Sequence, residues 1–301
     1  MAELGAGAKN FTKCQICVFL LDILSKGAYT NFIRIGEIEM FNKTHILYMI
    51  ISAIATSALL VPAAMFIKNE KWKNLIIRIL AVVTVVLHFS NLYVEFFTTG
   101  AATIGKEHLL PVYPCHIMMW LLLICAFLKK RDSKVAKVLQ EFTFYVGTVC
   151  ALAGLVFNEN FASNPTLSNW YVLKGLISHS TLIAGCIYIM VAGFIKCRVS
   201  NCISVVLGLC LFLVDGAIIN ALFAAFNLKP VNAMYLQKPP MESMPWATSW
   251  LMGLVGVTLL FIFAVLYEQF ALPEEERWYV LIKNKVVDIK TKIQNKKGEN
   301  K

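Results

Sequence analysis

Charged residues are scarce in this sequence. Lys, Arg, Asp and Glu together make up 15% of its 301 residues, whereas 58% are hydrophobic. Charges make up about a quarter of a typical soluble domain, so the composition excludes that class and predicts an all-α, polytopic membrane protein. The formal net charge of +10 does not indicate nucleic acid as a partner. The basic residues lie in short segments between apolar runs and in the C-terminal tail, as the positive-inside rule describes.

Paired metal-binding and disulfide motifs are also lacking. Most of the nine cysteines lie within apolar runs, where a thiol behaves as a small hydrophobic group, so we expect no disulfide framework. Cys14 and Cys17 form one CxxC, but no second pair supplies the four ligands of a structural zinc site. No HxxxH or HxxE spacing occurs within one run, and we expect neither a metal nor another cofactor.

Seven apolar runs are long enough to cross a bilayer, whose hydrocarbon core requires roughly twenty residues of helix. They are predicted at residues 45–67, 75–97, 109–128, 139–157, 172–195, 203–226 and 248–270. The chain therefore divides into an N-terminal interfacial segment (1–44), a bundle of about seven transmembrane helices (45–271) and a basic tail (272–301).

The distribution of Lys and Arg predicts the orientation of this bundle. These residues are most frequent after the first, third and fifth runs and in the tail, which favours an N-terminus outside and a C-terminus in the cytoplasm. Five basic residues in the N-terminal segment are the exception. We expect the cell membrane as the location, and contact between the basic tail and anionic lipid headgroups.

Polar residues within the runs gather toward the predicted outer side. In the second run, the imidazole of His88, the amide of Asn91 and the carboxylate of Glu95 are spaced at i, i+3 and i+7. The set comprises His45, Ser52, Thr56, His88, Asn91, Glu95, Cys115, His116, Asn158, Glu159, His179, Asp215 and Asn220. Interhelical hydrogen bonds are one explanation, which we favour for Ser52, Thr56 and Asn91. Ionisable groups at this depth are costly, so the whole set favours a buried polar pocket that opens outward.

Cys115 is the candidate nucleophile in that pocket. Pro114 suits the first position of a helix, which would place Cys115 and His116 among free amides at its positive end. Such amides stabilise a developing oxyanion. Adjacent helical residues diverge by about 100°, so the base is expected from another run. His179 is the first choice and His45 or His88 the reserves, with Glu95 orienting an imidazole as the third member of a triad.

Several short motifs carry a family resemblance that extends over all seven runs. They are Thr44-His45, Pro114-Cys115-His116, Ser178-His179, Asn220, Asn232, Tyr235 and Pro239. In order and placement they resemble the YwaF family of integral membrane proteins, relatives of transmembrane protein 164, a proposed Cys-dependent phospholipid acyltransferase. Many bacterial members have a cysteine where this chain has Met118, so the Pro-Cys-His form is similar to the eukaryotic branch. The resemblance implies Cys115 as nucleophile and His45, His116 and His179 as common site residues.

Two classes of function follow from these observations. The first is a lipid acyltransferase or acyl hydrolase that uses Cys115 and His179 on a phospholipid or other acyl donor, with His116 and Glu95 in support. The second is a transporter or receptor that binds a polar solute, a lipid headgroup or a proton in the same pocket, through His45, Glu95, His179 and Asp215. In both, His45, His88, Asn220, Asn232 and Tyr235 are candidate binding residues. A metal site formed by the three common histidines and Glu95 is the weakest alternative, and residues 227–247 form either a lid or a plain connector.

Overall fold

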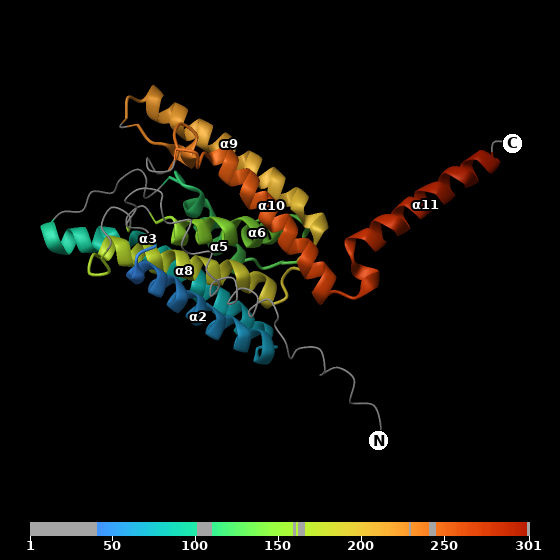
Figure 1. Cartoon of the computed structure of the whole chain (residues 1–301), viewed down its shortest axis with the longest axis horizontal. Helices are drawn as coiled ribbons and strands as arrows, with labels where there is room; N and C mark the ends of the chain where they lie inside the picture. The colour runs from blue at the N-terminus through green and yellow to red at the C-terminus, as the bar shows by residue number, and fades with distance from the viewer. Residues whose placement is uncertain are drawn as a thin grey trace, which may run out of the picture. The chain divides into compact units, whose positions relative to one another are not determined.

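The computed structural model describes residues 41–100, 110–158, 161, 166–228, 230–240 and 245–299. All regular structure within these residues is helical (Figure 1). The predicted interfacial segment lies outside the described residues except for its last four positions, and so does the CxxC motif.

Six helices are long and apolar enough to cross a membrane. They are α2 (Lys43–Phe66), α3 (Glu70–Thr99), α6 (Lys134–Val156), α8 (Trp170–Val191), α9 (Cys202–Ala225) and α10 (Ser249–Ala271). Their bounds lie within a few residues of six of the predicted runs. The chain is therefore a multi-pass membrane protein.

Polar side chains mark where most of these helices begin. In five of the six, the residue before the helix accepts a hydrogen bond from a first-turn amide through its side-chain oxygen: Asn42, Asn69, Ser133, Asn169 and Thr248. Such caps satisfy one of the amides that a helix leaves unpaired at its N-terminus. Local sequence thus fixes the starts of α2, α3, α6, α8 and α10.

The predicted run at 109–128 forms a shorter helix, α5 (Pro114–Ala126), of 13 residues. At 1.5 Å per residue it is about 20 Å long, less than a hydrocarbon core of about 30 Å. Tyr113 is extended before Pro114, and at the other end the Arg131 guanidinium donates to the carbonyl oxygens of Cys125 (2.8 Å) and Ala126 (3.4 Å). Helix length among the described residues therefore identifies six spans, and a seventh is not established by length.

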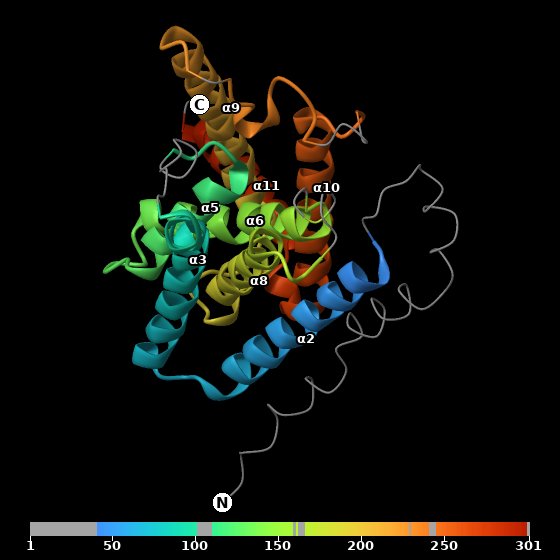
Figure 2. The ribbon, with the colours of Figure 1, turned by 90° about the vertical axis from the view of Figure 1, so that its left-hand side faces the viewer.

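Helix α8 is the central element and contacts α2, α3, α5 and α6 (Figure 2). Small polar side chains join it to two neighbours. Ser52 of α2 donates to Ser180 at 2.7 Å, and Thr84 of α3 lies 3.1 Å from the Thr181 hydroxyl. The role predicted for Ser52, as part of an interhelical hydrogen bond, is confirmed.

Helices α9 and α10 pack against each other and against α6. Between them lies the connector, residues 226–248, which contains the short helix η2 (Ala233–Tyr235). The turn η1 (Val199–Asn201) precedes α9, and the turn η3 (Glu274–Glu276) joins α10 to a last helix, α11 (Trp278–Glu299). Val199 of η1 and Trp278 of α11 both donate to Glu268, and Arg198 donates to Glu276 of η3.

Candidate functional site

Cys115 is the second residue of α5, directly after Pro114. The side chain is partly buried, and its thiol donates to the Cys150 carbonyl oxygen of α6 at 3.5 Å. The candidate nucleophile is therefore held by main chain of a neighbouring helix.

Gly147, Cys150 and Gly154 form one face of α6, at i, i+3 and i+7; we call this face the α6 stripe. Helix α8 approaches it closely. A Cβ atom on Gly147 would lie 2.5 Å from Cys186 Sγ, and one on Gly154 would lie 2.1 Å from His179 Nε2. Cys115 and His179 thus pack against the same stripe, about one helical turn, or 5.4 Å, apart along its axis.

Hydrogen bonding fixes the tautomer of the His179 imidazole. Its Nδ1 lies 2.7 Å from the Gly175 carbonyl oxygen, which can only accept. Nδ1 therefore carries the hydrogen, and in a neutral ring Nε2 is the acceptor. Nε2 is the atom that faces Gly154, on the side of the α6 stripe.

His116 lies between residues from α3 and the start of α5. Its ring centroid is 4.6 Å from that of His88 and 5.2 Å from that of Tyr113. The backbone of Leu110 is one hydrogen-bond partner of the ring, whereas the buried Nδ1 has none within the described structure. His88 is eleven residues, about 16 Å, before the last residue of α3, so α5 begins well inside the length of its neighbour.

Few amides are left to stabilise an oxyanion at the start of α5. Pro114 has no N–H, and the His116 amide already donates to the Tyr113 carbonyl oxygen at 2.9 Å. Within the described residues, the Cys115 amide is the one amide of the first turn that does not donate to a main-chain carbonyl. The expectation of several free amides is therefore wrong, because the first turn tightens onto Tyr113.

Lys174 is a candidate site residue that sequence reasoning overlooked. It lies in the second turn of α8 and interacts electrostatically with both His116 and His179. Within the described residues it forms no ion pair. The signal was present in the sequence, since Lys174 is an isolated lysine inside an apolar run, where charge is costly.

His45 is buried completely, and both of its ring nitrogens have protein partners. Nε2 lies 2.9 Å from the Leu155 carbonyl oxygen, and the Phe41 amide donates to Nδ1 at 3.3 Å. The ring also stacks on Phe161, with centroids 4.7 Å apart. His45 therefore satisfies a carbonyl in the last turn of α6, and its nitrogens are occupied where a ligand was expected.

Glu95 is joined to a tyrosine rather than to an imidazole among the bonds described. The Tyr171 hydroxyl donates to its Oε1 at 2.9 Å, which connects the last turns of α3 with the first turn of α8. The predicted triad with Glu95 as its third member is not assembled by this contact.

Asn220, Asn232 and Tyr235 shape the connector. Asn220 accepts from the Ala233 amide at 3.0 Å and donates to the Ala233 carbonyl at 3.3 Å. Asn232 accepts from the amides of Gln237 and Lys238 and donates to the Lys238 carbonyl. Both amide groups are thus used internally, where ligand binding was expected.

The connector reaches the start of α5 directly. The Met234 amide donates to the Val112 carbonyl at 2.8 Å, and Tyr235 stacks on Tyr113 with ring centroids 5.2 Å apart. Met234 and Tyr235 have positive φ angles of 51° and 53°, an uncommon conformation for side chains with a Cβ. Ser249 donates to both of their carbonyls, which stabilises this backbone.

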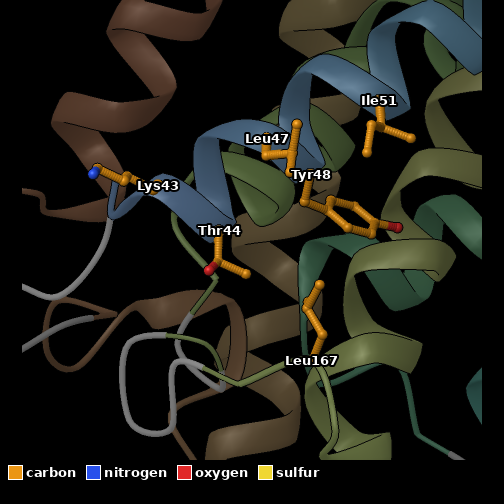
Figure 3. A pocket seen from close by; sticks show the side chains of 6 residues that line it. All are labelled: Lys43, Thr44, Leu47, Tyr48, Ile51 and Leu167. Atoms are coloured by element: carbon orange, nitrogen blue, oxygen red, sulfur yellow. The ribbon is translucent and has the colours of Figure 1, made fainter.

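A separate small pocket, about 190 Å³ in volume, lies beside the first turns of α2 (Figure 3). It is lined by Lys43, Thr44, Leu47, Tyr48 and Ile51 of α2, and by Leu167. The walls are mostly apolar, and Lys43 extends away from the other five side chains (Figure 3). None of these residues was a predicted site residue. In the part of the chain described, no group of three or more His, Cys, Asp or Glu side chains is arranged to hold a metal ion.

Comparison with known proteins gives one match. The model of the TMEM164 family matches residues 40–267, which include all six long helices up to the last turn of α10, together with α5. No curated protein and no solved structure matches the chain. The match confirms the relationship to transmembrane protein 164 that the Pro-Cys-His motif indicated. It does not confirm the name YwaF. Because the matched region covers most of the sequence, this multi-pass integral membrane protein belongs to the TMEM164 family.

Proposed function

We propose that the protein is a Cys-dependent acyltransferase that acts on membrane lipids. One observation carries the proposal: Cys115 and His179, from two different helices, pack against the α6 stripe one turn apart, with the acceptor nitrogen of His179 facing that stripe. A thiol and a basic nitrogen held on one side of a rigid helix are the parts that thiol-based acyl transfer requires.

The reaction would proceed in two steps. His179 Nε2 takes the proton of the Cys115 thiol, and the sulfur attacks the carbonyl carbon of a lipid ester. The C–O bond breaks, and the departing alkoxide takes the proton from His179, which leaves a thioester on Cys115. An acceptor alcohol then gives its proton to His179 and attacks the thioester carbon, and the departing sulfur is protonated again.

The thiol must first leave the Cys150 carbonyl, its partner in the absence of substrate. A separation of about one turn is longer than a hydrogen bond, so the sulfur approaches His179 only when substrate is present. Catalytic hydrogen bonds are often loose before substrate binds. The Cys115 amide supplies one donor to the oxyanion.

Lys174 and His116 support a phospholipid as the substrate. The Lys174 ammonium, which has no ion pair among the described residues, is suited to a headgroup phosphate. The buried His116 Nδ1 needs a donor, which an acceptor hydroxyl supplies. Glu95 keeps a supporting role through Tyr171, and His88 contributes by packing on His116.

The same proposal includes seven crossings, with the N-terminus outside the cell membrane. Basic residues follow α2, α5 and α8, and they lie on one side only if the chain crosses between the end of α3 and the start of α6. Helix α5 with its flanking residues is the segment available for this crossing. Its C-terminal end lies beside the start of α3, since Arg131 donates to Asn74 at 2.8 Å.

Intact-mass spectrometry of the purified, lipid-supplied protein tests the proposal. A hydroxylamine-sensitive acyl adduct is expected on the wild type in the absence of an acceptor, and none on Cys115→Ala. Cys150→Ala and Cys210→Ala are matched controls, because the first keeps the carbonyl that holds Cys115 and the second removes an exposed thiol. His179→Gln should form the adduct about 10² to 10⁴ times more slowly.

Two results would overturn the acyl-transfer proposal. One is an adduct that persists in Cys115→Ala. The other is an unreactive wild-type thiol under conditions in which lipid is bound. In the second case, weaker phospholipid binding by Lys174→Gln would support the alternative, a non-catalytic lipid-binding or transport site.

A further inference from the structure

A buried carboxylate joins the end of α10 to the start of α11. Glu268, 1% exposed, accepts hydrogen bonds from the Val199 amide at 2.6 Å and the Trp278 amide at 2.5 Å. We call Glu268 and these two amides the carboxylate clamp. It holds the first residue of α11 beside the last turn of α10, a membrane span. Helix α11 therefore begins at the level of the lipid headgroups.

An ion-pair cluster reinforces this junction from the neighbouring turns. Glu276 accepts from Lys196 at 3.2 Å and also pairs with Arg198, whose guanidinium donates to the Glu276 carbonyl at 2.8 Å. The Arg198 backbone is bonded in turn to the Tyr145 hydroxyl of α6. The start of α11 is thus tied to the membrane-spanning bundle through several independent contacts.

The side chains of α11 have an amphipathic arrangement. Four exposed apolar residues, at i, i+4, i+8 and i+11, share one face: Trp278, Ile282, Val286 and Ile289. Lys283 and Lys290 border this face on one side and Lys285 on the other. Asn284, Asp288 and Thr291 are opposite, where Val280, Leu281 and Val287 are apolar exceptions. No other helix in the described structure covers the apolar face.

We propose that α11 lies along the membrane surface and binds anionic phospholipid headgroups. Its apolar face enters the region between headgroups and acyl chains, and the bordering lysines reach back to the phosphates. Charge complementarity selects this partner, because lysines border the apolar face and Asp288, the acidic residue within 278–291, lies on the other side of the helix. The matched family region ends at residue 267, so this surface belongs to a part of the chain that the family match does not include.

Hydrogen exchange on the full-length protein in lipid nanodiscs tests this proposal. Peptides covering residues 278–291 are compared in zwitterionic lipid and in lipid with roughly a third anionic content. Exchange should be about tenfold slower in the anionic bilayer, and added salt should reverse much of this protection. Neither result requires enzymatic activity, so the test is independent of Cys115.

Charge-neutral variants give the specific control. Lys283→Gln, Lys285→Gln and Lys290→Gln together should abolish the difference between the two bilayers, since each surface lysine contributes roughly fivefold to binding. Lys129→Gln, Lys130→Gln and Lys134→Gln remove the same charge around the start of α6 and should leave the difference between the bilayers unchanged. Equal exchange in both bilayers would overturn the proposal. So would protection that follows protein concentration instead of lipid charge, because a second copy of the chain would then be the partner.

Discussion

Gly154 determines where the His179 ring can lie. A hydrogen is the largest group that fits, because a methyl carbon there would overlap both Nε2 and Cδ2 of the imidazole, at 2.1 and 2.3 Å. His179 itself is held from the other side by the Gly175 carbonyl. The orientation of the candidate base therefore depends on a residue with no functional group of its own.

Replacing Gly154 with alanine should displace the His179 ring. We expect destabilisation of about 1–3 kcal/mol from overpacking, measured as a lower midpoint of thermal unfolding in detergent. Adduct formation on Cys115 should fall about a hundredfold, as for other misplacements of a catalytic group by about 1 Å.

Gly253→Ala is the matched control for that variant. It lies in α10 with no atom within 4 Å of the added Cβ, so it should be neutral or slightly stabilising through its better helix propensity. Equal unfolding midpoints for the two alanine variants would contradict the packing explanation.

At the scale of elements, the short helix α5 and the connector form one unit. Residues 110–113, directly before α5, are not helical, and non-helical backbone at membrane depth needs protein partners. The Met234 amide is the partner of the Val112 carbonyl, and Asn220 and Ser249 in turn hold the connector backbone at residues 233–235. The connector is therefore part of the site wall at the start of α5.

Asn220→Ala should release the connector. The variant loses both hydrogen bonds to Ala233, and peptides covering residues 230–240 should exchange their amides faster by about tenfold. Asn284→Ala, on the polar face of α11, is a matched change that should leave the connector unaffected. Unchanged exchange in Asn220→Ala would show that Ser249 and Val112 are sufficient to hold η2.

At the scale of the whole molecule, ion pairs stabilise the junction between α10 and α11. Hydrogen bonds from Lys196 and Arg198 hold the pKa of Glu276 below its ordinary value of 4.5. A lowered folded-state pKa means that the ion pairs stabilise the junction above pH 4.5, and that this stabilisation is lost as pH falls through the lower folded value.

Acidification should therefore loosen the junction. Exchange of peptides covering residues 272–280, corrected for intrinsic rates, should accelerate below pH 4.5 in the wild type. Glu276→Gln should be looser at neutral pH and show little of this acid response, whereas Glu274→Gln, without such partners in the described structure, should follow the wild type. A wild-type junction that is insensitive to acid would contradict this role of the Glu276 ion pairs.

The sequence predicts the long helices well because length, apolarity and capping residues are local properties. Asn69 and Ser133, for example, cap the helices that follow them. The family relationship was also accessible, through the Pro-Cys-His motif and the histidines.

Contacts between residues far apart in the sequence were harder to predict. His45 bonds to Leu155, 110 positions away, and no local pattern distinguishes such a structural histidine from a ligand-binding one. The apolarity of residues 109–128 likewise conceals that Tyr113 is extended and that the connector packs there. Lys174 was missed although its position inside an apolar run was a usable signal.

The depth at which α5 begins also determines which measure of substrate concentration would govern the rate of the proposed reaction. The Cys115 thiol bonds to α6, and its neighbour His116 packs on His88 of α3. In the proposed reaction, a lipid substrate would therefore reach the thiol sideways, from within the lipid layer, rather than from bulk water. Encounter is then a two-dimensional process governed by lateral diffusion. The turnover of such a site depends on the mole fraction of substrate lipid in the bilayer, so inert lipid would slow it by dilution even when the amount of substrate per volume is unchanged.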